Sequence, residues 1–148
     1  MNKPSIVIAS DHAGFILKKE VSNYLWEKDL CDQITDIGCY NVNRCDYPNF
    51  AHQAIKQVTP NTYAILICGT GQGMAMTANK YPEVRAGVCY NTFQAQMIRE
   101  HNNANVLCLG ARCTSIEDAR NIVRTFLTTE FSKEERHQDR INKMMNLK

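Results

Sequence analysis

Long apolar stretches are missing from this chain. Its longest apolar runs, at 6–9 and 64–68, are far shorter than the ~20 residues that a membrane-spanning helix requires. The residues before Asp11 are also too few for the apolar region of a secretory signal peptide, which needs ~7–15 residues. We therefore expect a protein without a membrane partner that stays in the cytoplasm, where cysteines remain reduced.

An excess of charge of one sign is missing as well. Lys and Arg number 17 against 15 Asp and Glu, which gives a formal net charge of +2. Proteins that bind nucleic acids or anionic membrane surfaces usually carry a clear basic excess. The balance of charge therefore argues against both classes of partner.

Metal and redox motifs are scarce. Four His leave little room for a His-rich metal site, and the seven Cys include no Cys-x-x-Cys pair of the kind found in zinc and redox sites. Most of the cysteines are expected to be small buried apolar residues. A thiol-redox protein is accordingly the weakest of the function classes considered.

The residues that are present indicate one α/β domain over 1–148. Apolar residues make up 44% and charged residues 22%, which is ordinary globular usage. Uninterrupted apolar runs predict buried parallel strands at 6–9, 64–68, 86–89 and 106–109, with a weaker candidate at 33–37. Apolar stripes at helical spacing predict a helix over about 13–28 and another over about 116–127, the second one capped by Ser115. This alternation of strands and helices favours a parallel sheet.

The segment 130–148 is different in composition. Ser132 and Glu135 have the spacing of a capping box, which predicts a helix that continues to about 146. Its apolar surface is small for its length, and Arg136 and Arg140 lie four residues apart on one side. We expect a C-terminal helical arm that packs on a partner subunit or over a site, with a frayed terminal helix as the alternative.

The clearest candidate for a site is the glycine loop that follows the strand at 64–68. Gly69, Gly71 and Gly73 stand at alternate positions, so that the backbone can approach a ligand and its N–H groups can hold an anion. The loop matches neither the dinucleotide fingerprint nor a P-loop, and a tight strand–helix turn is the alternative interpretation. Cys68 directly precedes the loop, whose N–H groups would favour a thiolate that acts as base or nucleophile.

Several further polar residues also follow predicted strands or the helices between them. Asp11 and His12 come after the first strand, where the carboxylate could fix the imidazole tautomer. His101 ends the helix between the fourth and fifth strands. The arginines could together bind a phosphate, and these are Arg112, Arg136 and Arg140. His52 and His137 carry no signal beyond that of solvated surface residues.

Taken in order along the chain, these motifs resemble the ribose-5-phosphate isomerase B and galactose-6-phosphate isomerase family. The resemblance covers nearly the whole chain, and the chain is most similar to the ribose-5-phosphate isomerase B branch. It rests on the segments 10–15, 46–48, 68–73, 78–80, 85–86, 101–102, 105–107, 110–112 and 136–140. One subgroup of the family has a Glu directly after the last loop glycine, where this chain has Met74, so the resemblance leaves Cys68 as the base.

The resemblance implies a Rossmann-like three-layer α/β/α sandwich with a five-stranded parallel sheet and an extra C-terminal helix. It implies a homodimer, or a tetramer, with active sites shared between subunits, and no metal or cofactor. The reaction would interconvert ribose 5-phosphate and ribulose 5-phosphate through a cis-enediolate, a step of the non-oxidative pentose phosphate pathway.

The resemblance also implies a role for each site residue. Cys68 would transfer the proton, and Thr70 with the backbone of the three loop glycines would hold the enediolate oxygens. His101 would open the furanose ring from the partner subunit, with Asn102 beside it. The remaining residues would bind the substrate: Asp11 and Tyr47 the sugar, and His12, Arg112, Arg136 and Arg140 the phosphate.

Two other functions stay open at this point. The substrate could be a hexose 6-phosphate, such as allose or galactose 6-phosphate, because one extra carbon needs only a larger pocket. A non-catalytic module that binds a phosphorylated metabolite is compatible with the glycine loop alone. It would not require Cys68, His101 and the arginines together.

Overall fold

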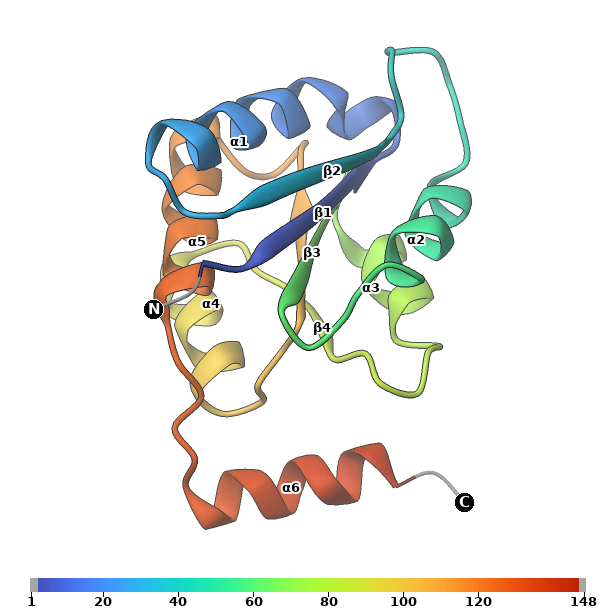
Figure 1. The fold of residues 1–148 in the computed structure, drawn as a ribbon. Coiled ribbons are helices and arrows are strands. Elements are labelled where there is room, and N and C mark those ends of the chain that lie inside the picture. The colour runs from blue at the N-terminus through green and yellow to red at the C-terminus, as the bar shows by residue number, and fades with distance from the viewer. Residues whose placement is uncertain (1–2, 147–148) are drawn as a thin grey trace.

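A computed structural model describes residues 3–146 of the chain. Its centre is a sheet of parallel strands in the order β2-β1-β3-β5-β4 (Figure 1). The strands are β1 (Ser5–Ser10), β2 (Gln33–Gly38), β3 (Thr62–Cys68), β4 (Ala86–Val88) and β5 (Val106–Gly110). The five-stranded parallel sheet is confirmed, including the weaker strand at 33–37.

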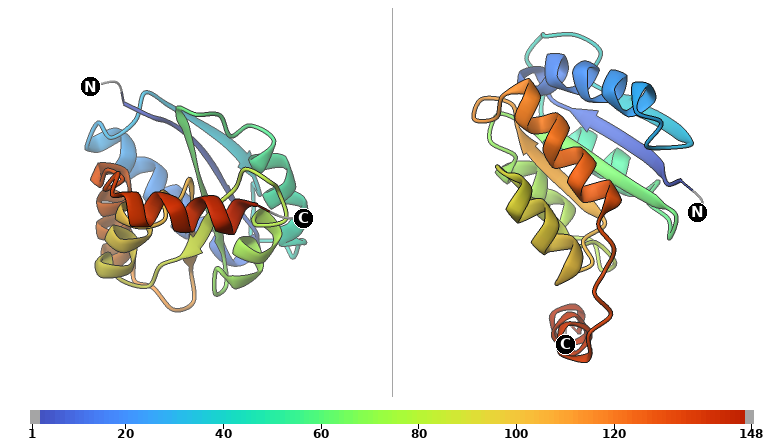
Figure 2. Two further views of the ribbon diagram at one scale, coloured as in Figure 1. Left: turned by 90° about the horizontal axis from the view of Figure 1, so that it is seen from below. Right: turned by 90° about the vertical axis from the view of Figure 1, so that its left-hand side faces the viewer.

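Helices cover both faces of the sheet. They are α1 (Phe15–Glu27), α2 (Tyr47–Ile55), α3 (Gln72–Ala78), α4 (Thr92–Glu100), α5 (Ile116–Thr128) and α6 (Glu135–Met145), with a short 3₁₀ turn η1 (His12–Gly14) before α1. One core lies between the sheet and α1, α4 and α5, and a second core lies between the sheet and α2 and α3 (Figures 1 and 2). The expected Rossmann-like three-layer sandwich is therefore confirmed.

The two helices predicted from apolar stripes form as expected. In α1 the residues Leu17, Val21, Tyr24 and Leu25 are buried against the sheet. Helix α5 begins after Ser115, whose hydroxyl accepts a hydrogen bond of 3.1 Å from the backbone N–H of Asp118. Within residues 3–146 no helix is long and apolar enough to cross a membrane.

The predicted start of the C-terminal helix is wrong by two residues. Helix α6 begins at Glu135 after the N-cap Glu134, whose side chain makes no capping bond. Ser132 lies in the linker between α5 and α6. Its hydroxyl is 2.7 Å from Nδ1 of His137 and accepts a hydrogen bond from the backbone N–H of Glu134. The serine therefore fastens the linker to the helix instead of capping it. Figure 2 shows α6 standing clear of the α/β body, as expected for an arm.

Candidate active site

Cys68 is the last residue of β3, and its side chain is buried against the glycine loop. The backbone N–H of Gly71 donates to the Cys68 sulfur over 3.2 Å. Gly71 has φ +83°, and a Cβ there would lie 3.1 Å from the carbonyl carbon of Leu109. Only glycine adopts this conformation without strain, so the loop's sequence is what points an N–H at the sulfur. Such a donor stabilises negative charge on the thiol.

Tyr47 and Asp11 approach the same loop from neighbouring elements. Tyr47 opens α2, and its ring packs so close to Gly73 that a Cβ on that glycine would lie 2.4 Å from the ring. Asp11 follows β1, is 6% exposed and accepts a bond of 3.2 Å from the backbone N–H of Gly14. The carboxyl ends of β1 and β3 and the start of α2 therefore bring a carboxylate, the thiol and a phenol to one edge of the sheet.

The tautomer of His12 is set by a different partner from the expected one. Nδ1 of His12 accepts a hydrogen bond of 3.3 Å from the backbone N–H of Cys45, so the ring proton is on Nε2. The Asp11 carboxylate serves as the N-cap of the η1 turn. Because the bond from Cys45 fixes the imidazole, His12 presents an N–H donor away from the β2–α2 loop.

Arg112 and Thr70 complete the group at this edge. The backbone N–H of Arg112 donates to the Gly69 carbonyl over 2.9 Å, and a Cβ on Gly69 would lie 3.2 Å from Nη1 of Arg112. Thr70 is exposed, and its hydroxyl accepts a bond of 3.3 Å from the N–H of Gln72. Its carbonyl accepts a bond of 2.8 Å from the hydroxyl of Tyr90, a contact that the sequence did not predict. The Tyr90 bond ties the middle of the glycine loop to the loop after β4.

The remaining predicted residues lie at the opposite edge of the sheet. His101 is the C-cap of α4, which ends where β5 begins, and Asn102 follows it. Arg136 and Arg140 belong to α6, which lies beyond this edge (Figure 1). The structure thus divides the predicted site into a Cys68 group and a His101 group, which a single chain does not bring together. The Cys68 group comprises Asp11, His12, Tyr47, Cys68, Gly69, Thr70, Gly71, Gly73 and Arg112.

His137 belongs with the His101 group, and the expectation that it is a solvated surface residue is wrong. Only 4% of its surface is exposed, and its ring lies 4.2 Å, centroid to centroid, from the ring of His101. Burial, together with the charges of His101 and Arg136, lowers the pKa of His137. A neutral imidazole accordingly joins α6 to the end of α4. Its spacing of five residues from Ser132, to which it hydrogen-bonds, is a weak sequence signal.

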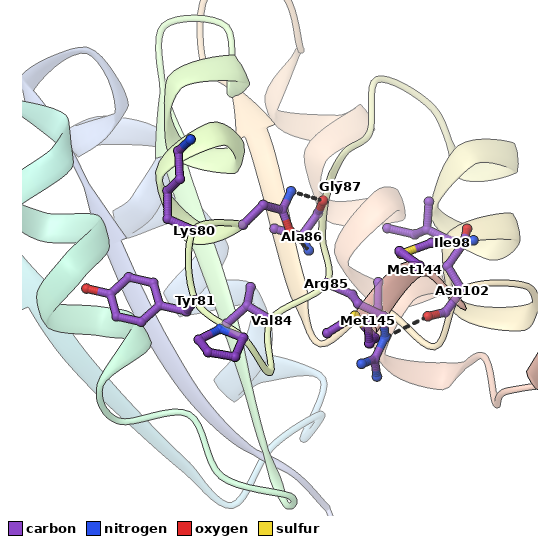
Figure 3. Close-up of a pocket in the computed structure, with 13 residues that line it drawn as sticks. Lys80, Tyr81, Val84, Arg85, Ala86, Gly87, Ile98, Asn102, Met144 and Met145 are labelled. Atoms are coloured by element: carbon purple, nitrogen blue, oxygen red, sulfur yellow. Dashed lines mark hydrogen bonds between the residues drawn. The ribbon is translucent and has the colours of Figure 1, made fainter. Parts of the chain in front are cut away.

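A groove of about 520 Å³ opens at this second edge. It lies between the loop before β4, the end of α4 and the end of α6, and Figure 3 shows Arg85, Asn102, Met144 and Met145 around it. Arg85 and Met144 mark its two sides, one on the α/β body and one on the arm. The His101 group therefore borders a concave surface.

Comparison with known proteins identifies the family to which this chain belongs. The model of the Ribose/Galactose Isomerase family matches residues 6–144, and the chain belongs to this family. The ribose-5-phosphate isomerase B of Escherichia coli is 39% identical over 138 residues, which cover 92% of this chain and 91% of that protein.

Solved structures of similar proteins agree with the fold. Ribose 5-phosphate isomerase B from Thermotoga maritima superposes with a TM-score of 0.92 at 40% identity, covering 97% of this chain and 99% of that one. Ribose-5-phosphate isomerase B from Mycoplasma genitalium, solved with bound ribulose 5-phosphate, has a TM-score of 0.91 at 38% identity and covers 98% of this chain and 96% of its own.

Proposed function

We propose that this protein interconverts ribose 5-phosphate and ribulose 5-phosphate by aldose–ketose isomerisation. Membership of the family supports the class of reaction, and the similarity to two ribose-5-phosphate isomerases B, one of them solved with bound ribulose 5-phosphate, supports the substrate. Within the structure, the observation that carries the proposal is the Gly71 N–H bonded to the sulfur of Cys68. This bond holds the thiol beside the N–H groups of the glycine loop, at the edge where parallel sheets bind ligands.

Cys68 is the proposed base. Its thiolate removes the proton from C2 of the open aldehyde, and the electron pair moves to give an enediolate. A proton passes from O2 to O1, the carbonyl forms at C2, and the resulting thiol gives its proton to C1, so that no atom is gained or lost in the conversion of aldose to ketose. The backbone of Gly69, Gly71 and Gly73 and the Thr70 hydroxyl hold the enediolate oxygens, where one such donor typically contributes ~2.7–4 kcal/mol to the transition state.

His101 is the proposed group for ring opening. Ribose 5-phosphate is mainly a furanose, so the C1–O4 bond must break while O1 loses a proton and O4 gains one. His101 can carry this proton, and Asn102 lies beside it. His101 and Cys68 are at opposite edges of the sheet. We therefore infer a homodimer in which each site combines Cys68 of one copy with His101 of the other.

Phosphate binding is proposed to use both edges in the same way. His12 presents its Nε2–H and Arg112 its guanidinium beside Gly69. Arg136 and Arg140 of the second copy would complete a clamp of three guanidiniums, which suit phosphate through paired N–H donors. Asp11 and Tyr47 line the space between the phosphate and the reacting carbons, where the sugar hydroxyls would lie.

The test is a coupled assay with EDTA that offers ribose 5-phosphate, allose 6-phosphate and galactose 6-phosphate to the purified protein. We expect strong turnover of the pentose phosphate and loss of that turnover in Cys68→Ala. Cys31→Ala is the matched control, because it removes a buried thiol remote from the loop. A preference for a hexose phosphate would contradict the substrate, and full activity of Cys68→Ala would contradict the mechanism.

A further inference from the structure

The turn that carries His101 and Asn102, residues 101–104, is held by an unusual set of contacts. It connects the end of α4 to β5, and Asn103 adopts φ +47°, in the left-handed region. The backbone N–H of Asn103 donates to the Arg99 carbonyl over 3.2 Å and that of Ala104 donates to the Ile98 carbonyl over 3.0 Å, so backbone hydrogen bonds close the end of α4 around the left-handed residue. The side chains of two arginines, Arg85 and Arg99, add further hydrogen bonds to this backbone.

Arg85 lies immediately before β4 and faces the turn from the α/β body. Its Nε donates to the carbonyl of Asn102 over 2.9 Å and to that of Asn103 over 3.2 Å, and its Nη2 donates to the Asn103 carbonyl over 2.9 Å. Figure 3 shows the first of these bonds at the rim of the groove. The planar guanidinium has several N–H donors in fixed positions, so it can hydrogen-bond to two successive carbonyls at once. A lysine ammonium group does not have this geometry.

Arg99 holds the other side of the same turn. It is 5% exposed, and its Nη1 donates to the Ala104 carbonyl over 2.7 Å and to the side-chain oxygen of Asn103 over 3.0 Å. Its Nε donates to the carbonyl of Thr129 over 3.1 Å, which ties the turn to the linker before α6. The guanidinium also lies over the rings of Tyr63 and Phe126, at 5.1 and 5.7 Å from the centroids.

Burying the two guanidiniums costs free energy, because each cation loses contacts with water. Burial lowers the pKa of both guanidiniums, and the charge of Arg99 further lowers the pKa of Arg85. Among residues 3–146 neither cation forms an ion pair, so carbonyls and rings alone compensate their desolvation. An apolar pair could pack the same space at lower cost, but it could not hold the carbonyls of a turn.

We propose that Arg85 and Arg99 are positioning residues that hold the turn 101–104 so that His101 and Asn102 face the substrate bound by the second copy. The inference rests on the proposed function, because it takes His101 as the group that opens the furanose ring. Neither arginine touches the substrate. Their effect reaches the reaction only through the geometry of His101.

The chemistry of the two substrates provides a selective measurement. Ribulose 5-phosphate cannot form a furanose, since its O5 carries the phosphate, and it therefore reaches the enediolate without ring opening. Cys68 can exchange the C1 proton of ribulose 5-phosphate with solvent deuterium even if His101 is displaced. A positioning defect thus slows the turnover of ribose 5-phosphate and spares the deuterium exchange, whereas general damage to the fold reduces both.

The experiment measures both rates for Arg85→Lys, which keeps the charge and removes the fork. We expect kcat for ribose 5-phosphate to fall by about 10- to 100-fold, the range typical of a misplaced catalytic group, with deuterium exchange close to that of the unmodified protein. Asn103→Gly provides a second route that keeps the left-handed turn and removes one acceptor of Arg99. Arg124→Lys, at an exposed position of α5, is the matched control and should change neither rate.

His101→Asn is the reference for the expected pattern of rates. We expect His101→Asn to lose turnover of ribose 5-phosphate and to keep deuterium exchange. The positioning role is overturned if, beside that result, Arg85→Lys and Asn103→Gly change neither rate. It is also overturned if these two variants lower both rates equally while their melting temperatures show an intact fold. If His101→Asn itself keeps full turnover of ribose 5-phosphate, the ring-opening role of His101 is overturned and the inference with it. Failure of isomerase activity in the unmodified protein would instead contradict the proposed function.

Discussion

Burial separates the cysteines of this chain by reactivity. Cys89 lies in the core, where burial raises its pKa to about 12. Burial and the nearby thiols of Cys68 and Cys89 raise the pKa of Cys108 well above its ordinary value. Cys113 is exposed at the loop after β5. Since the thiolate is the reactive form, the seven thiols should differ strongly in their rates of alkylation.

We therefore predict that iodoacetamide at mildly alkaline pH labels Cys113 in the folded protein and leaves Cys89 and Cys108 unmodified. Peptide mapping by mass spectrometry at successive times measures each rate. In guanidinium chloride all seven cysteines should react, which serves as the control. Labelling of Cys108 at the rate of Cys113 in the folded protein would contradict the packing of β5.

A buried lysine is a second feature of single residues that the sequence did not reveal. Lys18 in α1 is 1% exposed, and its ammonium lies 2.7 Å from the carboxylate of Asp36 and 2.5 Å from the carbonyl of Cys39. It also lies 5.3 Å from the ring centroid of Tyr40. The apolar stripe of α1 predicts the helix but not that a lysine beside the stripe reaches the end of β2. Lys18 thereby anchors the start of the loop that leads to Tyr47.

Replacement of Lys18 by Met should lower the free energy of unfolding by about 1.5–3 kcal/mol, the usual range for hydrogen bonds to a charged group. Met keeps the length of the side chain, so the loss reports on the ammonium contacts and not on a cavity. Lys19→Met, one residue further and exposed, should stay within about 0.5 kcal/mol. Urea denaturation of both variants measures the difference, and equal stabilities would show that the ion pair contributes nothing net.

At the scale of elements, the C-terminal arm depends on one neutral imidazole. His137 is buried between the ring of His101, on α4, and the hydroxyl of Ser132, in the linker. The titratable and charged groups near it are His101, Arg136, Arg140 and Glu134, of which only Glu134 favours protonation. Because the pKa of His137 is lowered in the folded chain, a detached arm binds a proton more readily than a docked one.

The docking of α6 should therefore weaken as the pH falls below the ordinary histidine pKa of about 6.5 and stay constant above it. Hydrogen exchange of α6 peptides, corrected for intrinsic rates, should show less protection at pH 5.5 than at pH 7.5. Peptides of α5 are the internal control, and His137→Gln should remove the pH dependence. Equal protection of α6 at both pH values would refute the prediction.

The elements differ in how far the sequence could predict them. Uninterrupted apolar runs identified the strands because a sheet covered on both faces leaves few polar positions. Helix α2 was missed although Pro48 in its first turn and the buried Ala51, Ala54 and Ile55 are a readable signal. The start of α6 could not be read, because Ser132 has two possible partners and only the fold brings His137 to its hydroxyl.

For the whole molecule, the order of the elements places the candidate site residues more firmly than any motif. In a parallel sheet the residues after a strand and the residues before the next strand lie at opposite edges. Cys68 is of the first kind and His101 of the second, so their separation could be predicted from the sequence. The hydrogen bonds from Arg85 and Arg99 to the turn could not be predicted from the sequence. Their acceptors include backbone carbonyls, which every residue possesses.

The separation of Cys68 and His101 gives the last prediction. Cys68→Ala and His101→Asn should each be inactive towards ribose 5-phosphate as pure proteins. When equal amounts are mixed and the subunits exchange at random, half of the dimers contain one copy of each variant. One of the two sites in such a dimer then has an intact Cys68 and an intact His101, so about a quarter of the original activity should return.

The control for this mixing experiment combines two variants whose substitutions all lie at the same edge of the sheet. Cys68→Ala mixed with a Tyr47→Phe, Cys68→Ala double variant should recover nothing, because both chains lack the base. Exchange of subunits is verified separately, by native mass spectrometry of chains that differ in isotope label. If exchange is complete and the first mixture stays inactive, Cys68 and His101 act within one chain, and α4 and its turn must then move across the sheet edge for the reaction to proceed.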